Sequence, residues 1–237
     1  MPTRVPLILG CSTFGEANTL NTRINSITEV QAVVDIFVGL GQTGFDTSRR
    51  YGAGTSEEFL GKLDLHDGVV DTKIFAATPG GYAPGPLRTS LVQSRAALRH
   101  QKIRVLYLHA PDRSSESAPF EDTLEEINKM HKEGLFGGLL TGKMLAPASV
   151  DATPTLAYAP GSRWDPNAGP TAVWYTARYT PLLDVVRELK EVTESHGITL
   201  SAAAQRWLQH HSALGPDDAV LMGVSRVDQV KPNVVDW

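Results

Sequence analysis

Short apolar runs alternate along this sequence with longer segments whose apolar residues recur at helical spacing. The helical pattern is clearest at 28–40, where apolar residues follow the spacing i, i+3, i+4, i+7, i+8 of one helix face. Five strands are expected, at 5–10, 43–47, 69–76, 103–109 and 219–224, the first of them from a short apolar run that ends at a glycine. Helices are expected at 28–40, 56–63, 86–100, 120–133, 181–195 and 200–211. Strands and helices that take turns along a chain indicate an α/β fold with a parallel sheet covered by helices.

Local signals refine the ends of these elements. Thr28 with Gln31, and Thr55 with Glu58, have the spacing of a capping box and predict the first turns of two helices. The stretch 145–172 is rich in proline and glycine and predicts a long loop. Loops of that length inside a compact domain are usually functional lids or disordered segments.

Length and composition narrow the class of protein. A chain of 237 residues is long enough for one domain with a sizeable core, and a single domain over 1–237 is expected. The formal net charge of −4 argues against general nucleic-acid binding, which favours a basic surface. No apolar run approaches the length that spans a bilayer, so no membrane partner is expected. The single cysteine, Cys11, cannot form an internal disulfide, which predicts a cytoplasmic protein.

Polar residues follow or end three of the expected strands. Asp46 and His109 come at strand ends, and Lys73 lies inside the run VVDTKIF. In parallel α/β folds the active site lies at the carboxyl ends of the strands. Each residue also has an ordinary interpretation. Asp46 could cap a turn, Lys73 could be a surface lysine, and His109 could be a core histidine. Three such residues on three different strands favour a functional site.

Two glycine-rich stretches look like nucleotide-binding motifs and fail on their context. GLGQTG (39–44) matches G-x-G-x-x-G, but it ends a helix and opens a strand, the reverse of a dinucleotide fingerprint. GGLLTGK (137–143) resembles a P-loop, yet Met144 stands where a hydroxyl must hold magnesium. Neither stretch therefore predicts a site by itself.

The stretch GFDTSRRYGAGTSEEFLG (44–61) resembles the signature of the aldo-keto reductases. In it Tyr51 stands five residues after Asp46, and the resemblance continues with DTKI and LYLHAPD. GGLLTGK, SRW at 162–164 and QRWLQHH at 205–211 are similar to the aflatoxin-aldehyde-reductase subgroup.

This resemblance implies a TIM-type (β/α)8 barrel and NADPH-dependent reduction of an aldehyde or ketone, with NADP(H) as cofactor and a small carbonyl compound as partner. It implies that Tyr51 donates the proton and that Lys73 lowers the pKa of Tyr51. Asp46 would hold Lys73, and His109 would hydrogen-bond and orient the substrate carbonyl. Reductases of this subgroup also serve in fungal secondary metabolism, so the resemblance allows that role for this chain as well.

The resemblance also assigns cofactor contacts. The stretch 137–143 would wrap the pyrophosphate with backbone N–H groups, and Arg163 matches an arginine that contacts the cofactor. The residues of the stretch 137–143 are Gly137, Gly138, Leu139, Leu140, Thr141, Gly142 and Lys143. Ser225, Gln229 and Asn233 fall on one face of an expected helix, and Arg226 suits a 2′-phosphate. The alternative for Ser225 and Arg226 is an N-cap and a solvated charge.

The chain departs from the family between residues 136 and 137, where an internal segment with strands five, six and seven is missing. That segment carries the residues that hold the nicotinamide. A barrel reduced to about five of eight strands has two open edges, through which a homodimer could form. Pro232 should also kink or shorten the last helix. The alternative function is a catalytically impaired remnant or shortened isoform that acts as a binding or regulatory protein.

The sequence does not name the substrate. Four residues just after the expected loop could line a pocket or belong to the core: Trp174, Tyr175, Arg178 and Tyr179.

Overall fold

The structure is a computed structural model that describes residues 4–82, 84–110, 167 and 170–237. The chain divides into two compact units. The first consists of Met1–Gly134 with Gly215–Val235, and the second of Leu135–Leu214 with Asp236–Trp237. The single domain expected from the sequence stays a prediction.

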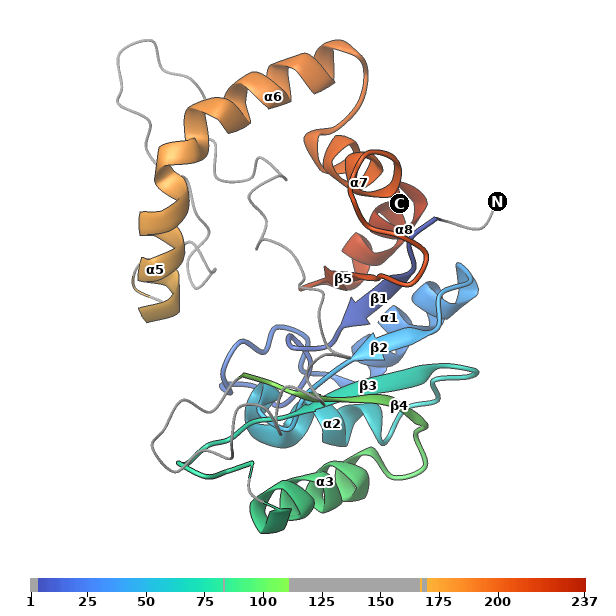
Figure 1. The fold of residues 1–237 in the computed structure, drawn as a ribbon. Coiled ribbons are helices and arrows are strands. Elements are labelled where there is room, and N and C mark those ends of the chain that lie inside the picture. Colours follow the sequence, from blue (N-terminus) through green and yellow to red (C-terminus); the bar gives the residue numbers. More distant parts are fainter. Residues whose placement is uncertain (1–3, 83, 111–166, 168–169) are drawn as a thin grey trace. The chain divides into compact units, whose positions relative to one another are not determined.

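The first unit is built on one parallel sheet (Figure 1). Its strands are β1 (Leu7–Gly10), β2 (Gly44–Asp46), β3 (Val69–Ile74), β4 (Ile103–Leu108) and β5 (Val220–Gly223). They lie in the order β4-β3-β2-β1-β5, and every neighbouring pair is parallel. All five were predicted from the sequence, to within two residues at each end. Among the described residues, the strands at the two edges of the sheet are β4 and β5.

This arrangement is that of a (β/α)8 barrel cut to five strands in the described part of the chain. The strand order follows the chain from β1 to β4, and β5 returns to the other side of β1. In a closed barrel the first and last strands pair in the same way, and the register Leu7↔Val220 to Gly10↔Gly223 shows that pairing here. The truncated barrel predicted from the sequence is therefore the observed fold.

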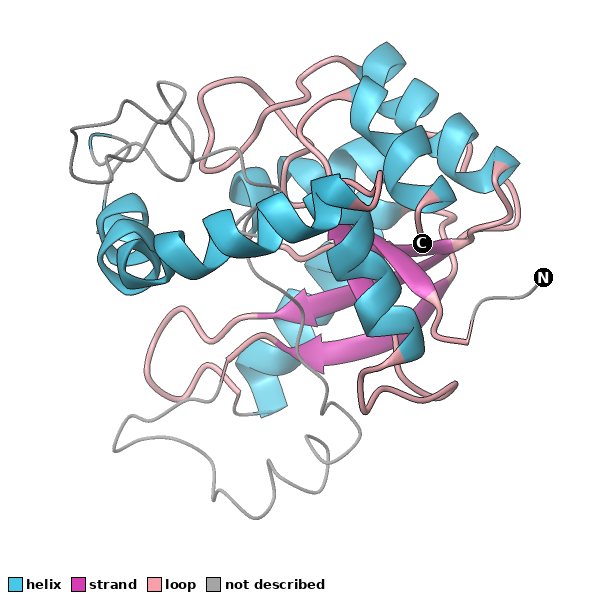
Figure 2. Cartoon of the chain, turned by 90° about the horizontal axis from the view of Figure 1, so that it is seen from above, coloured by secondary structure: helices cyan, strands magenta, loops and turns pink. Residues whose placement is uncertain are grey.

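The described residues of this unit form four α-helices, labelled in Figure 1 and drawn among the cyan helices of Figure 2: α1 (Ile27–Gly39), α2 (Thr55–Leu60), α3 (Pro84–Leu98) and α8 (Val230–Val235). Helix α1 buries Val30, Val33, Val34 and Phe37, the apolar face read from the sequence. The edge of the Phe37 ring packs on Phe45 of β2, with ring centroids 5.6 Å apart. Helix α8 is short, as Pro232 led us to expect. The expected helix 120–133 lies outside the described residues.

Both predicted capping boxes are wrong. The cap of α1 is Ser26, whose side chain accepts from the Glu29 N–H. Gln31 instead donates to the backbone oxygen of Asp64, at 2.8 Å. Helix α2 is preceded by Gly54, which has no side chain to cap it. Thr55 donates to the Gly52 carbonyl oxygen and so closes the turn before the helix. Both starts are therefore set by local hydrogen bonds other than the predicted ones, and Gln31 is used in a contact with a distant turn.

The stretch GLGQTG ends a helix and opens a strand, as predicted. Helix α1 ends at Gly39, and Leu40 is its C-cap. Gly41 has a φ of +82°, in the left-handed region that glycine enters at little cost. Strand β2 begins at Gly44, so these glycines serve a turn.

The second unit contains α5 (Pro170–Tyr179), α6 (Leu183–Ser195) and α7 (Leu200–His210). A small core joins them, made of Tyr179, Leu183, Val186 and Leu200 with Tyr175 packed against it. Trp174 stays exposed, so the aromatic cluster is only partly core. Helix α5 was not predicted, because its first residues were assigned to the loop 145–172. Most of that loop lies outside the described residues.

No described helix combines the length and the apolar character needed to cross a membrane.

Candidate active site

Four polar residues predicted from the sequence meet at the carboxyl edge of the sheet. Asp46 ends β2, Lys73 lies near the end of β3, and His109 follows β4 directly. Tyr51 begins a short 3₁₀ turn five residues after Asp46. Parallel strands place their carboxyl ends at one edge, which brings residues distant in the sequence together. The four predicted catalytic residues therefore form one cluster.

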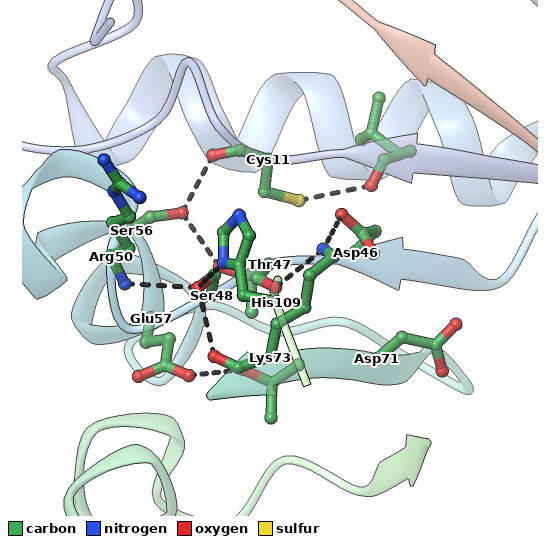
Figure 3. Close-up of polar contacts among 12 residues, drawn as sticks. Cys11, Asp46, Thr47, Ser48, Arg50, Ser56, Glu57, Asp71, Lys73 and His109 are labelled. Atoms are coloured by element: carbon green, nitrogen blue, oxygen red, sulfur yellow. Dashed lines mark hydrogen bonds and ion pairs between the residues drawn. The ribbon is translucent and has the colours of Figure 1, made fainter. Parts of the chain in front are cut away.

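A buried ion pair forms the base of this cluster (Figure 3). Lys73 Nζ lies 2.5 Å from Asp46 Oδ1 and donates a second hydrogen bond to the Thr47 carbonyl oxygen at 3.1 Å. The two side chains are only 15% and 6% exposed. Burial raises the pKa of Asp46, and the charge of Lys73 opposes that rise. The predicted Asp46–Lys73 pair is thus observed.

Tyr51 lies over this pair and beside His109. Lys73 Nζ is 5.1 Å from the centroid of the Tyr51 ring, and the Tyr51 and His109 rings meet edge to face with centroids 5.5 Å apart. The pKa of Tyr51 is raised, first by burial, while Lys73 lowers it and Asp46 raises it. Lys73 thus lowers the pKa of Tyr51 as expected, but burial outweighs the lysine and the pKa is raised overall. The phenol stays protonated at neutral pH, which is the form that can donate a proton.

The turn Tyr51–Gly54 explains the glycines of the motif. Gly52 has a φ of +55°, and a Cβ there would lie 2.7 Å from Thr55 Oγ1. Gly54 has a φ of +99°, and a Cβ would lie 2.7 Å from Cζ of Arg49. Both positions therefore need glycine. The turn lets the chain leave β2 and enter α2 directly after Tyr51.

His109 is neutral at physiological pH. Its backbone N–H donates to the Ile74 carbonyl oxygen at 2.7 Å, and its Nδ1 lies 2.9 Å from Ser48 Oγ. Burial, followed by the positive charges of Lys73 and Arg50, lowers the pKa of His109 to about 4. His109 is only partly buried, so the interpretation as a core histidine does not describe it.

This pKa shift predicts a pH-dependent loss of stability. The pKa of His109 is about 6.5 in the unfolded chain and about 4 in the folded chain, so between these two pH values the unfolded state binds more protons at His109. Stability therefore falls as the pH drops through that window. We expect His109→Asn to reduce the loss between pH ~7 and ~5 by about 1 kcal/mol, after discounting for partial exposure.

Urea unfolding of the wild type and the variant at both pH values measures this effect. His100→Asn, at an exposed histidine, is the matched control and should keep the wild-type pH dependence. An unchanged pH dependence in His109→Asn would contradict the assigned shift.

Three further residues of the cluster were missed from the sequence. Ser48 is fully buried and contacts His109. The Arg50 guanidinium lies 4.1 Å from the centroid of the Phe75 ring, whose edge meets His109. Cys11 is also buried, and its Sγ donates to the Leu9 carbonyl oxygen at 3.4 Å. Burial raises the pKa of Cys11 well above its usual value, so the thiol stays protonated at neutral pH. The only sequence signal for Ser48 was its place two residues after Asp46.

Of the predicted phosphate-binding residues in the last segment, Ser225, Arg226 and Gln229 contact one another. Gln229 Oε1 accepts from the Ser225 N–H at 2.8 Å, from Ser225 Oγ at 3.2 Å and from the Arg226 N–H at 3.3 Å. Arg226 is exposed and pairs with Asp228 at 3.1 Å. The single helix face expected for Ser225, Gln229 and Asn233 is wrong, because Val227–Gln229 form a 3₁₀ turn before α8 begins. Arg226 is thus a solvated charge, as the alternative interpretation had it, but the N-cap of that turn is Arg226 and not Ser225.

Other predicted sites lie outside the described residues, namely the stretch 137–143 and Arg163. In the described part of the chain, no group of three histidine, cysteine or acidic side chains could hold a metal ion.

Comparison with known proteins gives a consistent result. Residues 6–139 match the model of the Aldo/keto reductase family. The aldo-keto reductase pigE of Monascus ruber is 25% identical over 311 residues, covering 98% of this chain and 89% of the relative. Aflatoxin B1 aldehyde reductase member 4 of Homo sapiens is 25% identical over 275 residues, covering 86% of this chain and 82% of the relative.

Solved structures show the same fold. An aldo-keto reductase from Klebsiella pneumoniae in complex with NADPH matches with a TM-score of 0.57 and 16% identity, covering 100% of this chain and 90% of that chain. The glycerol dehydrogenase AKR11B4 from Gluconobacter oxydans matches with a TM-score of 0.60 and 18% identity, covering 99% and 88%.

Proposed function

Because this chain belongs to the aldo/keto reductase family, we propose that it reduces an aldehyde or ketone to the alcohol with NADPH, and that Tyr51 donates the proton. The observation that carries this proposal is the cluster of Tyr51 and His109 over the buried Asp46–Lys73 pair. Its members come from three strand ends and one turn, and a reductase needs all of their chemistry at one place.

The cofactor is NADP(H), and the donor groups of the last segment fit its phosphate. Two of the similar solved structures are complexes with NADPH and with NADP. In this chain, two backbone N–H groups and the Ser225 hydroxyl converge on one oxygen of Gln229. A phosphate oxygen accepts the same hydrogen bonds and adds negative charge, which Arg226 can pair with. When bound, the cofactor supplies a hydride to the carbonyl carbon.

Protonation of the substrate oxygen falls to Tyr51. The oxygen gains negative charge as the carbonyl is reduced, and a proton donor at that point lowers the barrier. Tyr51 is protonated at neutral pH, since burial raises its pKa. After it donates, Lys73 stabilises the phenolate by its charge, 5.1 Å from the ring. Asp46 holds Lys73 in place through the 2.5 Å contact.

His109 orients the substrate. It is neutral, so it adds no positive charge beside Lys73 that would disfavour the ammonium. We propose that it hydrogen-bonds the substrate oxygen and holds the carbonyl against Tyr51. The stretch 137–143 and Arg163 are proposed to contact the cofactor, at the pyrophosphate and along its length.

Cofactor preference gives a direct prediction for Arg226. Arg226→Ala should raise the Kd for NADPH by about tenfold and leave the Kd for NADH nearly unchanged, because only NADPH carries the 2′-phosphate. Quenching or enhancement of cofactor fluorescence measures both constants. Lys231→Ala removes an exposed cation of the same segment and is the matched control. Equal weakening of both cofactors by Arg226→Ala would refute the assignment of the phosphate site.

An assay of NADPH consumption with a panel of aldehydes and ketones tests the proposed function. We expect turnover of at least one aldehyde that depends on Tyr51. Binding of NADPH without turnover of any carbonyl would contradict the proposed reaction.

A further inference from the structure

The imidazole of His109 is held on one side by a single hydroxyl. Ser48 is fully buried, and its Oγ lies 2.9 Å from His109 Nδ1 (Figure 3). The same Oγ lies 3.0 Å from the Lys73 carbonyl oxygen and accepts the Arg50 N–H at 3.2 Å. Among the residues that the structure describes, His109 Nε2 has no hydrogen-bond partner. The contact with Ser48 is thus the only side-chain hydrogen bond of the ring in that part of the chain.

A count of hydrogens assigns the ring tautomer. A serine hydroxyl has one hydrogen and two lone pairs, and a neutral imidazole carries one hydrogen. The Lys73 carbonyl can only accept, and the Arg50 N–H can only donate. When the hydroxyl donates to Lys73, its free lone pair faces His109 Nδ1. Every group is then satisfied only if Nδ1 carries the ring hydrogen, which leaves Nε2 as an acceptor.

The carbonyl oxygen of a bound substrate, however, needs a hydrogen-bond donor. Nδ1 first releases its proton to water and Nε2 takes one from water, so the ring stays neutral. Nδ1 is then an acceptor, and the Ser48 hydroxyl can turn from the Lys73 carbonyl oxygen at 3.0 Å to Nδ1 at 2.9 Å without moving a heavy atom. The hydrogen bond from Ser48 to Nδ1 makes Nε2–H a stronger donor through cooperativity.

We propose that Ser48 is a positioning residue whose hydroxyl decides which nitrogen of His109 carries the ring hydrogen, Nδ1 in the free chain and Nε2 when a carbonyl binds. The change to the Nε2 form when a carbonyl binds rests on the proposed reduction. The Nδ1 form of the free chain does not depend on turnover.

Nitrogen-15 NMR of labelled histidine measures the tautomer directly. The His109 signals are identified by their loss in His109→Asn. In the free wild type near neutral pH we expect the hydrogen on Nδ1. In Ser48→Ala we expect it on Nε2, because a buried N–H without an acceptor costs more than an unpaired lone pair. Benzaldehyde with NADP⁺, which cannot react, should move the wild type to the Nε2 form.

Ser56→Ala is the matched control, since Ser56 is equally buried and its Oγ contacts Thr47 Oγ1 and the Cys11 carbonyl oxygen. It should keep the wild-type tautomer. Ser48→Ala should also lower kcat with benzaldehyde by about tenfold while the Kd for NADPH stays unchanged, as expected when a positioning contact is lost.

A free wild type with the hydrogen on Nε2, or a Ser48→Ala tautomer equal to that of the wild type, would overturn this assignment. A wild type that never consumes NADPH but shows the expected tautomers in the free chain would instead refute the proposed function. The two failures are therefore distinguishable.

Discussion

Replacing Tyr51 by phenylalanine should lower kcat for carbonyl reduction by about 10²- to 10⁴-fold, the usual contribution of a positioned general acid. The ring and its edge-to-face contact with His109 are kept, so the variant should fold like the wild type. The Kd for NADPH should also stay the same, since only the hydroxyl is removed. Steady-state kinetics together with a cofactor titration measures both quantities.

Tyr82→Phe is the matched control for Tyr51→Phe. Tyr82 is also buried, and its hydroxyl donates to the Ala110 and Ile74 carbonyl oxygens, which is a structural role. Its loss should cost stability and change kcat only a few-fold. If Tyr51→Phe kept wild-type kcat, another group would have to supply the proton and the proposed mechanism would be wrong.

Lys73→Met should be the most destabilising of the substitutions considered, by about 3 kcal/mol near neutral pH, because it leaves the Asp46 carboxylate buried without its partner. Activity should fall with it, since the charge that stabilises the Tyr51 phenolate is gone. Urea unfolding measures the stability, and the assay of NADPH consumption measures the rate.

The pH dependence of this loss has a definite sign. Burial already raises the pKa of Asp46, and removing Lys73 raises it further. A carboxyl with a folded pKa above its unfolded value binds more protons when folded, so stability falls as the pH rises through that window. The deficit of Lys73→Met should therefore shrink in mild acid.

The double variant Asp46→Asn with Lys73→Met is the control for Lys73→Met. It has no unpaired buried charge, and we expect it to regain much of the lost stability while remaining inactive. A double variant as unstable as Lys73→Met alone would show that packing, and not the unpaired carboxylate, causes the loss.

The sequence predicted the sheet and the catalytic cluster because both depend on patterns along the chain. All five strands could be recognised in the sequence, and parallel strands bring their carboxyl ends together, so Asp46, Lys73 and His109 had to meet. In the described part of the chain the sheet ends at β4 on one side and at β5 on the other.

What depends on tertiary surroundings was not predicted. The direction of the Tyr51 pKa follows from burial, which the motif does not contain. The start of α1 is capped by Ser26, and Gln31 is recruited by Asp64 from a distant turn. The contact between Ser48 and His109 joins residues 61 positions apart and appears only once β2 and β4 are placed. The helix at Pro170–Tyr179 was hidden by the proline- and glycine-rich stretch before it.

The central claim is that this chain, with five strands in its described part, still binds and uses NADPH. A titration of the purified chain with NADPH, followed by cofactor fluorescence and paired with a thermal unfolding scan, tests that claim most directly. We predict saturable binding at micromolar concentrations, with an increase in thermal stability upon binding. A chain that unfolds cooperatively but does not bind NADPH would contradict the account, and would favour a catalytically impaired remnant that acts as a binding protein.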